Sequence, residues 1–481
     1  MRMTLQFLGA TREVTGSCHL LSVDHEHLLL DCGLIQGGKE DELRNHDPFT
    51  FEPESISAVV LSHAHIDHSG RLPLLVKSGF DGPIYTHKAT AELCAIMLKD
   101  AAMLQSRDTE RTNKKRAKHD LEPLEPLFTV EDVEQVMRQF IPLEYGQVIN
   151  VIPHVDICLS DAGHILGSAL VEIWLGEGKS QKKIVFSGDL GRAGMPILHN
   201  PTLVDTADLV LMESTYGDRF HRSWTDTLAE LKAIFTKAVT ESHGNILLPA
   251  FSVGRAQELL YLFHLYAKEW DLSRWRICLD SPMAIEATRV YVNNYQLMDE
   301  DFKHFTRQSP GKHPLLSNVE FIQTTEESIA LNDIHKGLII IAGSGMCNGG
   351  RIRSHFEHNL WRPECDVIIC GYQARGTPGR ALVDGAEELT IHGNSIKVAA
   401  KLHTVGGLSA HADQAELLHW YHHFDDQPPP LVLVHGEPEA QQGLVDVINQ
   451  DPKTRPKDIA IAAYGDKLDL TALPRLMWIT S

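Results

Sequence analysis

The sequence predicts an α/β protein built of layered strands and helices, with a separate parallel α/β unit in its middle. Short strand-like runs dominate up to about residue 217, and several end in a histidine or an acid. From about 218 to 388 buried strands alternate with longer helices, and after 389 the earlier pattern returns. Because repeated strand–loop–acid and strand–loop–histidine units converge on one site, we expect a layered α/β enzyme.

The bulk composition excludes several classes of protein. The chain has 481 residues, too many for one core, and its formal net charge of −20 argues against nonspecific nucleic-acid binding. A metal-rich cleft would nevertheless carry its own positive charge. No run is long and apolar enough to span a membrane, the first residues do not resemble a secretory signal, and the eight cysteines form no CxxC pair. We therefore expect a cytoplasmic protein with no membrane partner.

The most informative stretch is residues 63–68, His-Ala-His-Ile-Asp-His. It follows a β-branched run at 58–62 and precedes a helix-like run at 71–76, which places four potential ligands on a loop at a strand end. A tetrahedral zinc ion needs four ligands, and a hydrolytic zinc keeps one position open for water. The four groups of this stretch are more than half of one site needs, but they are too few for two complete sites. The remaining ligands must therefore come from other parts of the chain.

Further strand ends provide the remaining candidates. One histidine lies in the glycine-bracketed segment 161–168, one aspartate follows the strand at 183–187, and another histidine follows the strand at 431–434. The full set of candidate ligands is His63, His65, Asp67, His68, His164, Asp189 and His435. Imidazoles and carboxylates in these numbers suit two zinc ions, and a carboxylate such as Asp189 can bridge them. Two such metals can clamp both oxygens of a displacement at phosphorus.

Three other features leave alternatives open. Asp31 ends a buried strand and is either a turn former or a hydrogen-bond partner of a ligand histidine. The basic run at 111–119 closes a helix predicted over 90–120, and is either a solvated end or a rim near a polyanion. The glycine-rich segment 343–350, between a strand and a helix, is either a tight turn or a phosphate cradle.

Together these motifs resemble those of the metallo-β-lactamase fold, and more narrowly the β-CASP nucleases. Residues 63–68 with His164 and Asp189 carry the first resemblance; Glu213 in Glu-Ser-Thr-Tyr-Gly, His411 in Ser-Ala-His-Ala-Asp and His435 in Val-His-Gly carry the second. The branch they resemble includes the endonuclease subunit of the cleavage and polyadenylation specificity factor. The resemblance implies a four-layer αβ/βα sandwich over 1–217 and 389–481, with a parallel α/β β-CASP domain inserted over 218–388.

The resemblance also implies a role for each motif residue. His63, His65 and His164 would hold one zinc, Asp67, His68 and His435 a second, and Asp189 would bridge. Asp31 would hydrogen-bond a ligand histidine. Asp67, His411 and Glu213 would be catalytic, with His411 giving a proton to the leaving 3′ oxygen and Glu213 keeping its imidazole charged. Residues that would contact RNA phosphates or line the same cleft are Ser344, Gly345, Met346, Arg351, Phe251, Ser252 and Arg255.

The implied function is a two-zinc ribonuclease that is mainly endonucleolytic, with 5′ exonuclease activity as an option, in RNA processing or degradation. The substrate would be single-stranded RNA held in a cleft between the domains, and the resemblance is compatible with a homodimer. His435 favours RNA, because DNA-directed members typically carry valine there. The alternatives are a DNA nuclease and a hydrolase of small esters or thioesters, of which the latter leaves Glu213, His411 and the inserted domain unexplained.

Overall fold

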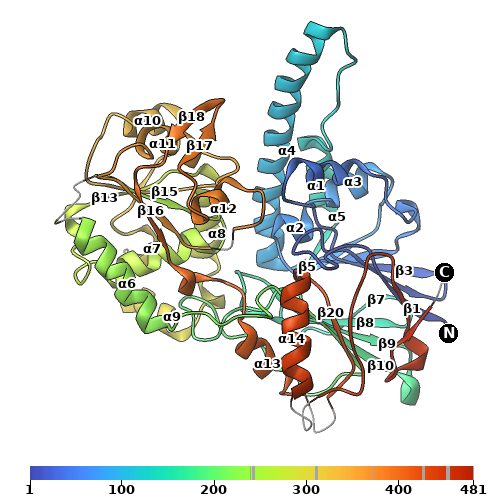
Figure 1. The fold of residues 1–481 in the computed structure, drawn as a ribbon. Helices are drawn as coiled ribbons and strands as arrows, with labels where there is room; N and C mark the ends of the chain where they lie inside the picture. The colour runs from blue at the N-terminus through green and yellow to red at the C-terminus, as the bar shows by residue number, and fades with distance from the viewer. Residues whose placement is uncertain are drawn as a thin grey trace. The chain divides into compact units, whose positions relative to one another are not determined.

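The computed structural model describes residues 1–238, 240, 244–308, 313–371, 373–424, 428–450 and 455–479. Its chain divides into two compact units. Unit 1 comprises residues 1–193, 200–220 and 411–481, and unit 2 comprises 194–199 and 221–410. Figure 1 shows the course of the chain through both units.

Unit 1 contains two mixed sheets. The first has eight strands in the order β23-β22-β1-β2-β3-β4-β5-β6, antiparallel from β23 to β3 and parallel from β3 to β6. In chain order these strands are β1 (Met3–Phe7), β2 (His19–Val23), β3 (Glu26–Leu30), β4 (Ala58–Val60), β5 (Ile84–His87), β6 (Phe140–Leu143), β22 (Lys467–Asp469) and β23 (Met477–Trp478). The predicted strand at 58–62 is β4, and its carboxyl end leads into residues 63–68.

The second sheet has seven strands in the order β21-β20-β11-β10-β9-β8-β7. They are β7 (Ile149–Ile152), β8 (Val155–Asp161), β9 (Ala169–Leu175), β10 (Lys182–Phe186), β11 (Leu209–Met212), β20 (Leu431–Leu433) and β21 (Ile459–Ile461). The central strands β10, β11 and β20 run parallel, so their carboxyl ends lie at one edge. Asp189, Glu213 and His435 follow these three strands and are therefore brought together.

The two sheets pack face to face around the main core of unit 1. Buried side chains from both sheets, such as Leu5 and Leu30 in the first and Ile157 and Leu211 in the second, belong to one apolar cluster. The helices on the outside of the first sheet are α1 (Lys39–Leu43), α2 (Ile66–Ser69), α3 (Leu72–Lys77), α4 (Lys88–Arg116) and α5 (Val130–Gln139). Helices α13 (Gln414–Tyr421) and α14 (Pro438–Gln450) cover the second sheet through another cluster. This is the predicted four-layer sandwich.

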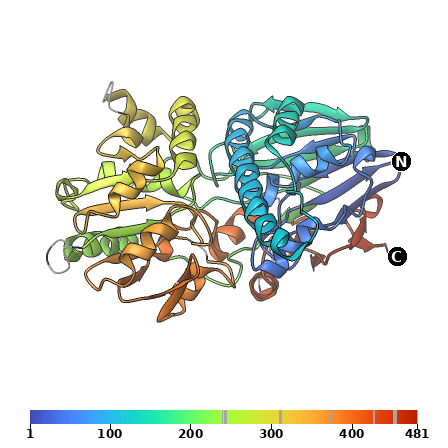
Figure 2. The same ribbon diagram turned by 90° about the horizontal axis from the view of Figure 1, so that it is seen from above.

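Unit 2 is the predicted parallel α/β unit, with a six-stranded sheet in the order β14-β13-β15-β12-β16-β19. Every pairing in this sheet is parallel, and Figure 2 shows its strands and helices from above. The strands are β12 (Ile246–Pro249), β13 (Arg276–Leu279), β14 (Glu320–Phe321), β15 (Leu338–Ala342), β16 (Asp366–Ile369) and β19 (Lys401–Thr404), and β17 (Glu388–Ile391) and β18 (Asn394–Lys397) form a hairpin. The helices are α6 (Trp224–Lys237), α7 (Arg255–Leu265), α8 (Pro282–Asn293), α9 (Glu300–Gln308), α10 (Thr325–Leu331), α11 (Ile352–Asn359) and α12 (Pro378–Val383).

The structure corrects the predicted end of the inserted domain. The boundary expected at 388 falls inside unit 2, which continues to Ala410. The reason is strand pairing: β19 adds to the edge of the unit 2 sheet, with Asp366 opposite Lys401 and Ile369 opposite Thr404. Its short, half-exposed sequence resembles the edge strands of unit 1, which is why the pattern placed it with residues 389–481 in the sandwich. Separately, no helix among the described residues has the length and apolarity needed to cross a bilayer.

Candidate metal centre and active site

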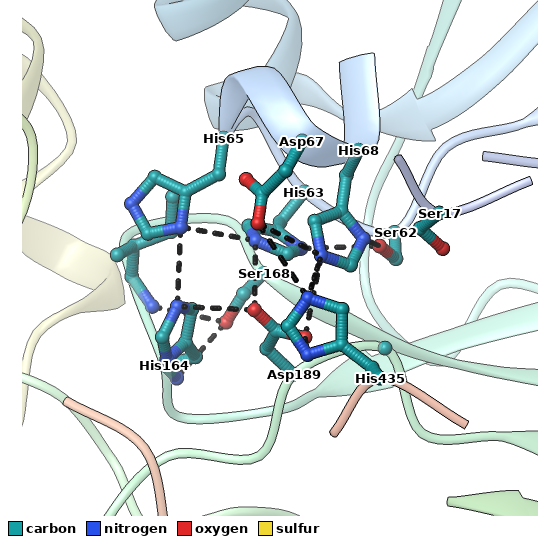
Figure 3. A network of polar contacts seen from close by, with 12 residues as sticks. Ser17, Ser62, His63, His65, Asp67, His68, His164, Ser168, Asp189 and His435 are labelled. Carbon is teal, nitrogen blue, oxygen red and sulfur yellow. Dashed lines mark hydrogen bonds and ion pairs between the residues drawn. The ribbon is translucent and has the colours of Figure 1, made fainter. Parts of the chain in front are cut away.

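Residues 63–68, which we call the histidine loop, are fixed by contacts with neighbouring strand ends. The backbone N–H of Ser17 donates to the carbonyl oxygen of Asp67 at 2.8 Å. Gly33 packs so closely against the loop that a Cβ atom there would lie 1.6 Å from the same oxygen, which only glycine avoids. The loop then turns into α2, and its side chains project toward His164, Asp189 and His435 (Figure 3).

The first cluster joins two histidines of the loop to His164 and Asp189. His65 Nδ1 lies 3.1 Å from His63 Nε2 and 3.2 Å from His164 Nε2. Asp189 Oδ2 lies 3.5 Å from His63 Nε2 and 3.6 Å from His164 Nε2. A tetrahedron with zinc–ligand bonds of about 2.0–2.1 Å has edges of about 3.3 Å, so these spacings fit four ligands around one ion.

The second cluster lies on the other side of the same aspartate. His68 Nε2 is 3.3 Å from His435 Nε2, and Asp67 Oδ2 is 3.5 Å from His435 Nε2 and 4.0 Å from His68 Nε2. Asp189 Oδ1 lies 3.3 Å from His68 Nε2. Asp189 therefore turns one oxygen toward each cluster, the arrangement that a bridging carboxylate needs (Figure 3).

Three candidate ligands of the first cluster have protonation states that suit a divalent metal ion, whereas in the second cluster Asp189 and Asp31 outweigh burial and raise the pKa of His68 well above its ordinary value. Burial lowers the pKa of His65 to about 4 and that of His63 well below its ordinary value, so both imidazoles are neutral at pH 7 and present lone pairs. Burial opposes the ionised form of Asp189, but His435 and His68 outweigh it and keep the pKa of this carboxyl well below its usual range. Among the described residues no hydrogen-bond donor satisfies its buried Oδ1. A buried charge of this kind needs a cation.

A hydrogen-bonded aspartate orients one of the candidate ligand histidines. Asp31 Oδ2 lies 2.7 Å from His68 Nδ1, which directs Nε2 of the same ring toward the second cluster. Ser17 Oγ and Ser62 Oγ each donate to that oxygen at 3.0 Å, and the Ser62 N–H donates to Oδ1 at 2.8 Å. Asp31 thus makes the contact expected of a residue that fixes the tautomer of a metal-binding histidine.

Glu213 and His411 form a pair beside Asp189. Glu213 is fully buried, and its Oε1 lies 3.1 Å from His411 Nδ1 while accepting the Leu190 N–H at 2.7 Å. The backbone of His411 bridges to Gly191, which holds the ring next to the centre. Burial disfavours the charged imidazole, but Glu213 and then Asp189 outweigh it and raise the pKa of His411 to about 9. The ring is therefore protonated at neutral pH in the absence of other cations.

The predicted RNA-contact residues all belong to unit 2. Phe251 and Ser252 follow β12, and Ser344, Gly345 and Met346 follow β15, so they lie at the carboxyl ends of neighbouring strands. The Phe251 ring packs against Gly345, where a Cβ atom would lie 2.7 Å from it. Ser344 Oγ is hydrogen-bonded to Asn348 Oδ1 at 2.8 Å within its own loop. Their contact with RNA stays a prediction.

The two predicted arginines already have protein partners. Arg351 donates from Nη1 to Asp280 Oδ1 at 2.6 Å and to the Ile322 carbonyl at 3.0 Å, and from Nη2 to the Gln323 carbonyl at 3.0 Å. Arg255 is buried and ion-paired with Glu258. Arg351 therefore joins β13 to the segment before α10, a structural role that the sequence did not suggest.

Two hydroxyl groups at the centre were missed by the sequence reasoning. Thr215 Oγ1 lies 3.1 Å from His435 Nδ1, and Ser62 Oγ lies 3.1 Å from His63 Nδ1. Ser62 contacts the ring nitrogen of His63 that faces away from the first cluster. Thr215 contacts His435 Nδ1, which also lies 3.4 Å from Asp189 Oδ1. Their only signal in the sequence is position: Ser62 directly precedes the histidine loop, and Thr215 lies two residues after Glu213.

Comparisons with known proteins agree with this geometry. The chain matches a metallo-beta-lactamase superfamily domain over residues 20–211, a Beta-Casp domain over 256–382 and a Zn-dependent metallo-hydrolase RNA specificity domain over 395–460. Ribonuclease TTHA0252 of Thermus thermophilus is 39% identical over 95% of this chain and 98% of its own length. Transcription termination factor FttA of Pyrococcus abyssi is 31% identical over 92% of this chain and 68% of its own length.

A solved structure shares the fold across nearly the whole chain. It is a protein of unknown function from Enterococcus faecalis V583, with a TM-score of 0.51 and 15% identity, covering 98% of this chain and 100% of that one. Fold, centre and matches together define a metal-dependent hydrolase of the metallo-β-lactamase superfamily. The chain belongs to the β-CASP family within it, since the matches span almost its full length. The resemblance drawn from the motifs is thereby confirmed.

We expect Asp31→Ala to weaken metal binding by about 10- to 100-fold, because His68 loses the partner that orients its ring. The measurement is zinc affinity in competition with a chromophoric chelator. Asp47→Ala, which removes an exposed carboxylate of the same unit, is the matched control. Equal zinc affinity in wild type and Asp31→Ala would contradict the orienting role.

We expect Arg351→Ala to lower the free energy of unfolding by about 2 kcal/mol, because three hydrogen bonds are lost and Asp280 keeps its buried charge. Denaturant unfolding of the full chain measures this effect, with the exposed Arg307→Ala as control. If Arg351 served only to contact phosphates, the variant would bind RNA more weakly and unfold as wild type does.

Proposed function

We propose that the chain is a two-zinc ribonuclease that hydrolyses phosphodiester bonds of single-stranded RNA, mainly by internal cleavage and also from the 5′ end. The observation that carries the proposal is Asp189, whose two oxygens face two clusters of ligand atoms while His411 and Glu213 lie beside it. The names of two relatives, a ribonuclease and a transcription termination factor, support RNA as the polymer. The homodimer remains a prediction from the family.

The seven clustered residues would hold the metal ions. His63, His65, His164 and Asp189 would bind the first, and Asp67, His68, His435 and Asp189 the second. Zinc bound there would lower the pKa of a water molecule and act as a Lewis acid toward the phosphoryl oxygens. Every ligand atom named above is an imidazole nitrogen or a carboxylate oxygen, the donor types that zinc accepts in hydrolases.

The carboxylate of Asp67 would orient the attacking water. Its side chain is 19% exposed, whereas that of Asp189 is 1% exposed, so among these two carboxylates Asp67 is the one that substrate and solvent reach. A hydrogen bond from water to Asp67 would align the water oxygen with the phosphorus atom. Attack would then form a bond from the water oxygen to phosphorus as the bond from phosphorus to the 3′ oxygen breaks, and the proton lost by the water would pass to the Asp67 carboxylate.

His411 would supply the proton that the leaving 3′ oxygen needs. Glu213 faces Nδ1 of the ring, so the donated proton comes from Nε2. Glu213 is itself immobilised by two backbone N–H groups, those of Leu190 and Thr215, which keep its carboxylate in place. The products are a 5′ phosphate and a 3′ hydroxyl. Glu213 acts through His411 and is a positioning residue.

We expect about two zinc ions per wild-type chain by elemental analysis, and loss of RNA cleavage after dialysis against a chelator, with recovery on adding zinc. His164→Ala should bind fewer metal ions, because the first cluster loses a ligand. A chain whose RNA cleavage persists after the metal content has fallen to zero would refute the proposal. His154→Ala, which alters an exposed histidine outside the centre, is the control.

We expect His411→Ala to cleave ordinary RNA about 10²- to 10⁴-fold more slowly, the typical contribution of a general acid. A substrate with sulfur in place of the bridging 3′ oxygen needs no proton on its leaving group, so cleavage of that substrate should be nearly as fast in the variant as in wild type. Glu213→Gln should show the same pattern to a smaller extent. Equal losses on both substrates would show that His411 does not donate the proton.

A further inference from the structure

The longest helix of unit 1 carries a charged surface that the metal centre does not use. Helix α4 is 29 residues long, and its buried side chains are confined to its first half, ending at Ala102. Figure 1 shows the second half extending past α1 and α3 of the same unit. Residues 103–116 would project by about 20 Å at 1.5 Å per residue.

The projecting half, residues 103–116, is held in place by hydrogen bonds to the segment that follows it. We call it the arm. The helix ends in a short 3₁₀ turn, Ala117–His119, and Asp120 in the left-handed conformation reverses the chain. The returning segment is tied to the helix by Asn113, which exchanges hydrogen bonds with the backbone of Leu124 at 2.8 Å in both directions. Arg116 Nε donates to the Glu122 carbonyl at 2.7 Å. One face of the arm is therefore occupied by its own return segment.

The other face carries a stripe of cations, which we call the basic stripe. Its members recur at i, i+4, i+7, i+8 and i+11, a spacing that gathers them within about 100° of one helix face. They are Arg107, Arg111, Lys114 and Lys115 of α4 and Lys118 in the 3₁₀ turn that continues it, and all are exposed. Arg116, the one cation of the tip that lies on the opposite face, is the one bonded to the return segment. Cations gathered along a single face form a surface suited to a linear polyanion.

Arg107 of the basic stripe interacts electrostatically with Asp100, whereas the lysines of the stripe have no acidic partner among the described residues. Within the described part of the chain, Lys114, Lys115 and Lys118 take part in no ion pair. Arg111 lies 3.6 Å from Asp108, but both side chains are more than three-quarters exposed, at 78% and 76%, and such pairs contribute little. Between residues 111 and 119 the sequence has no acid, in a chain whose net charge is −20. Positive charge concentrated on one helix of an acidic protein indicates a binding surface for a negatively charged partner.

We propose that the basic stripe of α4 binds the phosphate backbone of the RNA substrate at a distance from the bond that is cut. This inference rests on the proposed ribonuclease function. Lysine is depleted in the core of protein–protein interfaces and aromatic residues are enriched there, yet residues 103–118 contain three lysines, all near the tip, and no aromatic ring. Without aromatic rings for base stacking, the contacts are to phosphates and carry no sequence preference.

The same helix connects the basic stripe to the metal centre. Near its start Thr90 Oγ1 donates to the Gly167 carbonyl at 2.6 Å, in the loop that carries His164. About 38 Å of helix separate Thr90 from Lys115. An RNA of a few nucleotides can occupy the centre alone, whereas a long strand can occupy the centre and the stripe together. The stripe should therefore lower KM for long RNA and leave short RNA unaffected.

The test uses the full chain with Arg111→Gln, Lys114→Gln and Lys115→Gln combined. Glutamine keeps helix propensity, and circular dichroism and thermal melting verify the fold. The control combines Arg138→Gln, Lys457→Gln and Arg475→Gln, three exposed cations of unit 1 whose loss gives the same net charge. Binding of a labelled 30-nucleotide single-stranded RNA is measured by anisotropy with a chelator present, so that no cleavage occurs, and cleavage of 4- and 30-nucleotide RNAs is measured with zinc.

We expect the stripe variant to bind the long RNA about 100-fold more weakly near 0.1 M salt, and the slope of log affinity against log salt to flatten by about 2, because each phosphate contact to a single strand contributes about 0.7. KM of the stripe variant for the long RNA rises, its kcat stays the same, and the variant cleaves the 4-nucleotide RNA as wild type does.

If the stripe variant binds the long RNA as tightly as wild type or the control variant does, the inference is wrong. Cleavage of RNA by wild type would in that case still support the proposed function. A changed mass by light scattering with unchanged RNA affinity also overturns the inference and assigns the stripe to contact between copies of the chain. Absence of cleavage by wild type with long RNA still bound through the stripe would refute the proposed function alone.

Discussion

The buried carboxylate of Asp189 is the constraint on which the rest of unit 1 depends. Its side chain is 1% exposed and has imidazole nitrogens of His63, His68, His164 and His435 within 3.6 Å. A buried carboxylate is stable only with compensating positive charge, and burial keeps most of the first cluster's imidazoles neutral. Metal ions would supply that charge. Metal binding would therefore stabilise the strand ends that carry the candidate ligands.

The sheet topology explains why these residues can meet at all. Asp189, Glu213 and His435 follow three adjacent parallel strands, β10, β11 and β20, although more than 240 residues separate the first from the last. Unit 2 is inserted between β11 and β20, which leaves their pairing intact: Val210 lies opposite Leu431 and Met212 opposite Leu433. A large insertion is tolerated there because it enters and leaves at the ends of neighbouring elements.

Much of the fold and most of the centre could be predicted from the sequence, because both leave local signals. Strands such as β4 and β15 are runs of buried β-branched residues, and the ligands lie next to their ends. The residues that hydrogen-bond the candidate ligands left weaker signals in the sequence. Thr215 and Ser62 are ordinary hydroxyl residues until the fold places them against His435 and His63. The family resemblance predicts Arg351 as a phosphate contact, whereas its structural partner Asp280 lies 71 positions away in sequence and left no local signal. Contacts of that separation depend on register, which residue patterns do not encode.

The acidic character of the chain becomes understandable once its positive charge is located. A protein of net charge −20 repels RNA at long range, which suppresses nonspecific coating of its surface. Productive binding then requires local cations, and unit 1 provides for them in two different ways. At the centre, the ligand set would recruit metal ions whose charge is fixed in a buried site and weakly screened by salt. On the arm of α4, lysine and arginine side chains stand in solvent, where salt screens them strongly. One helix connects the two places, so an RNA strand bound at the arm would be held at a set distance from the reacting phosphate.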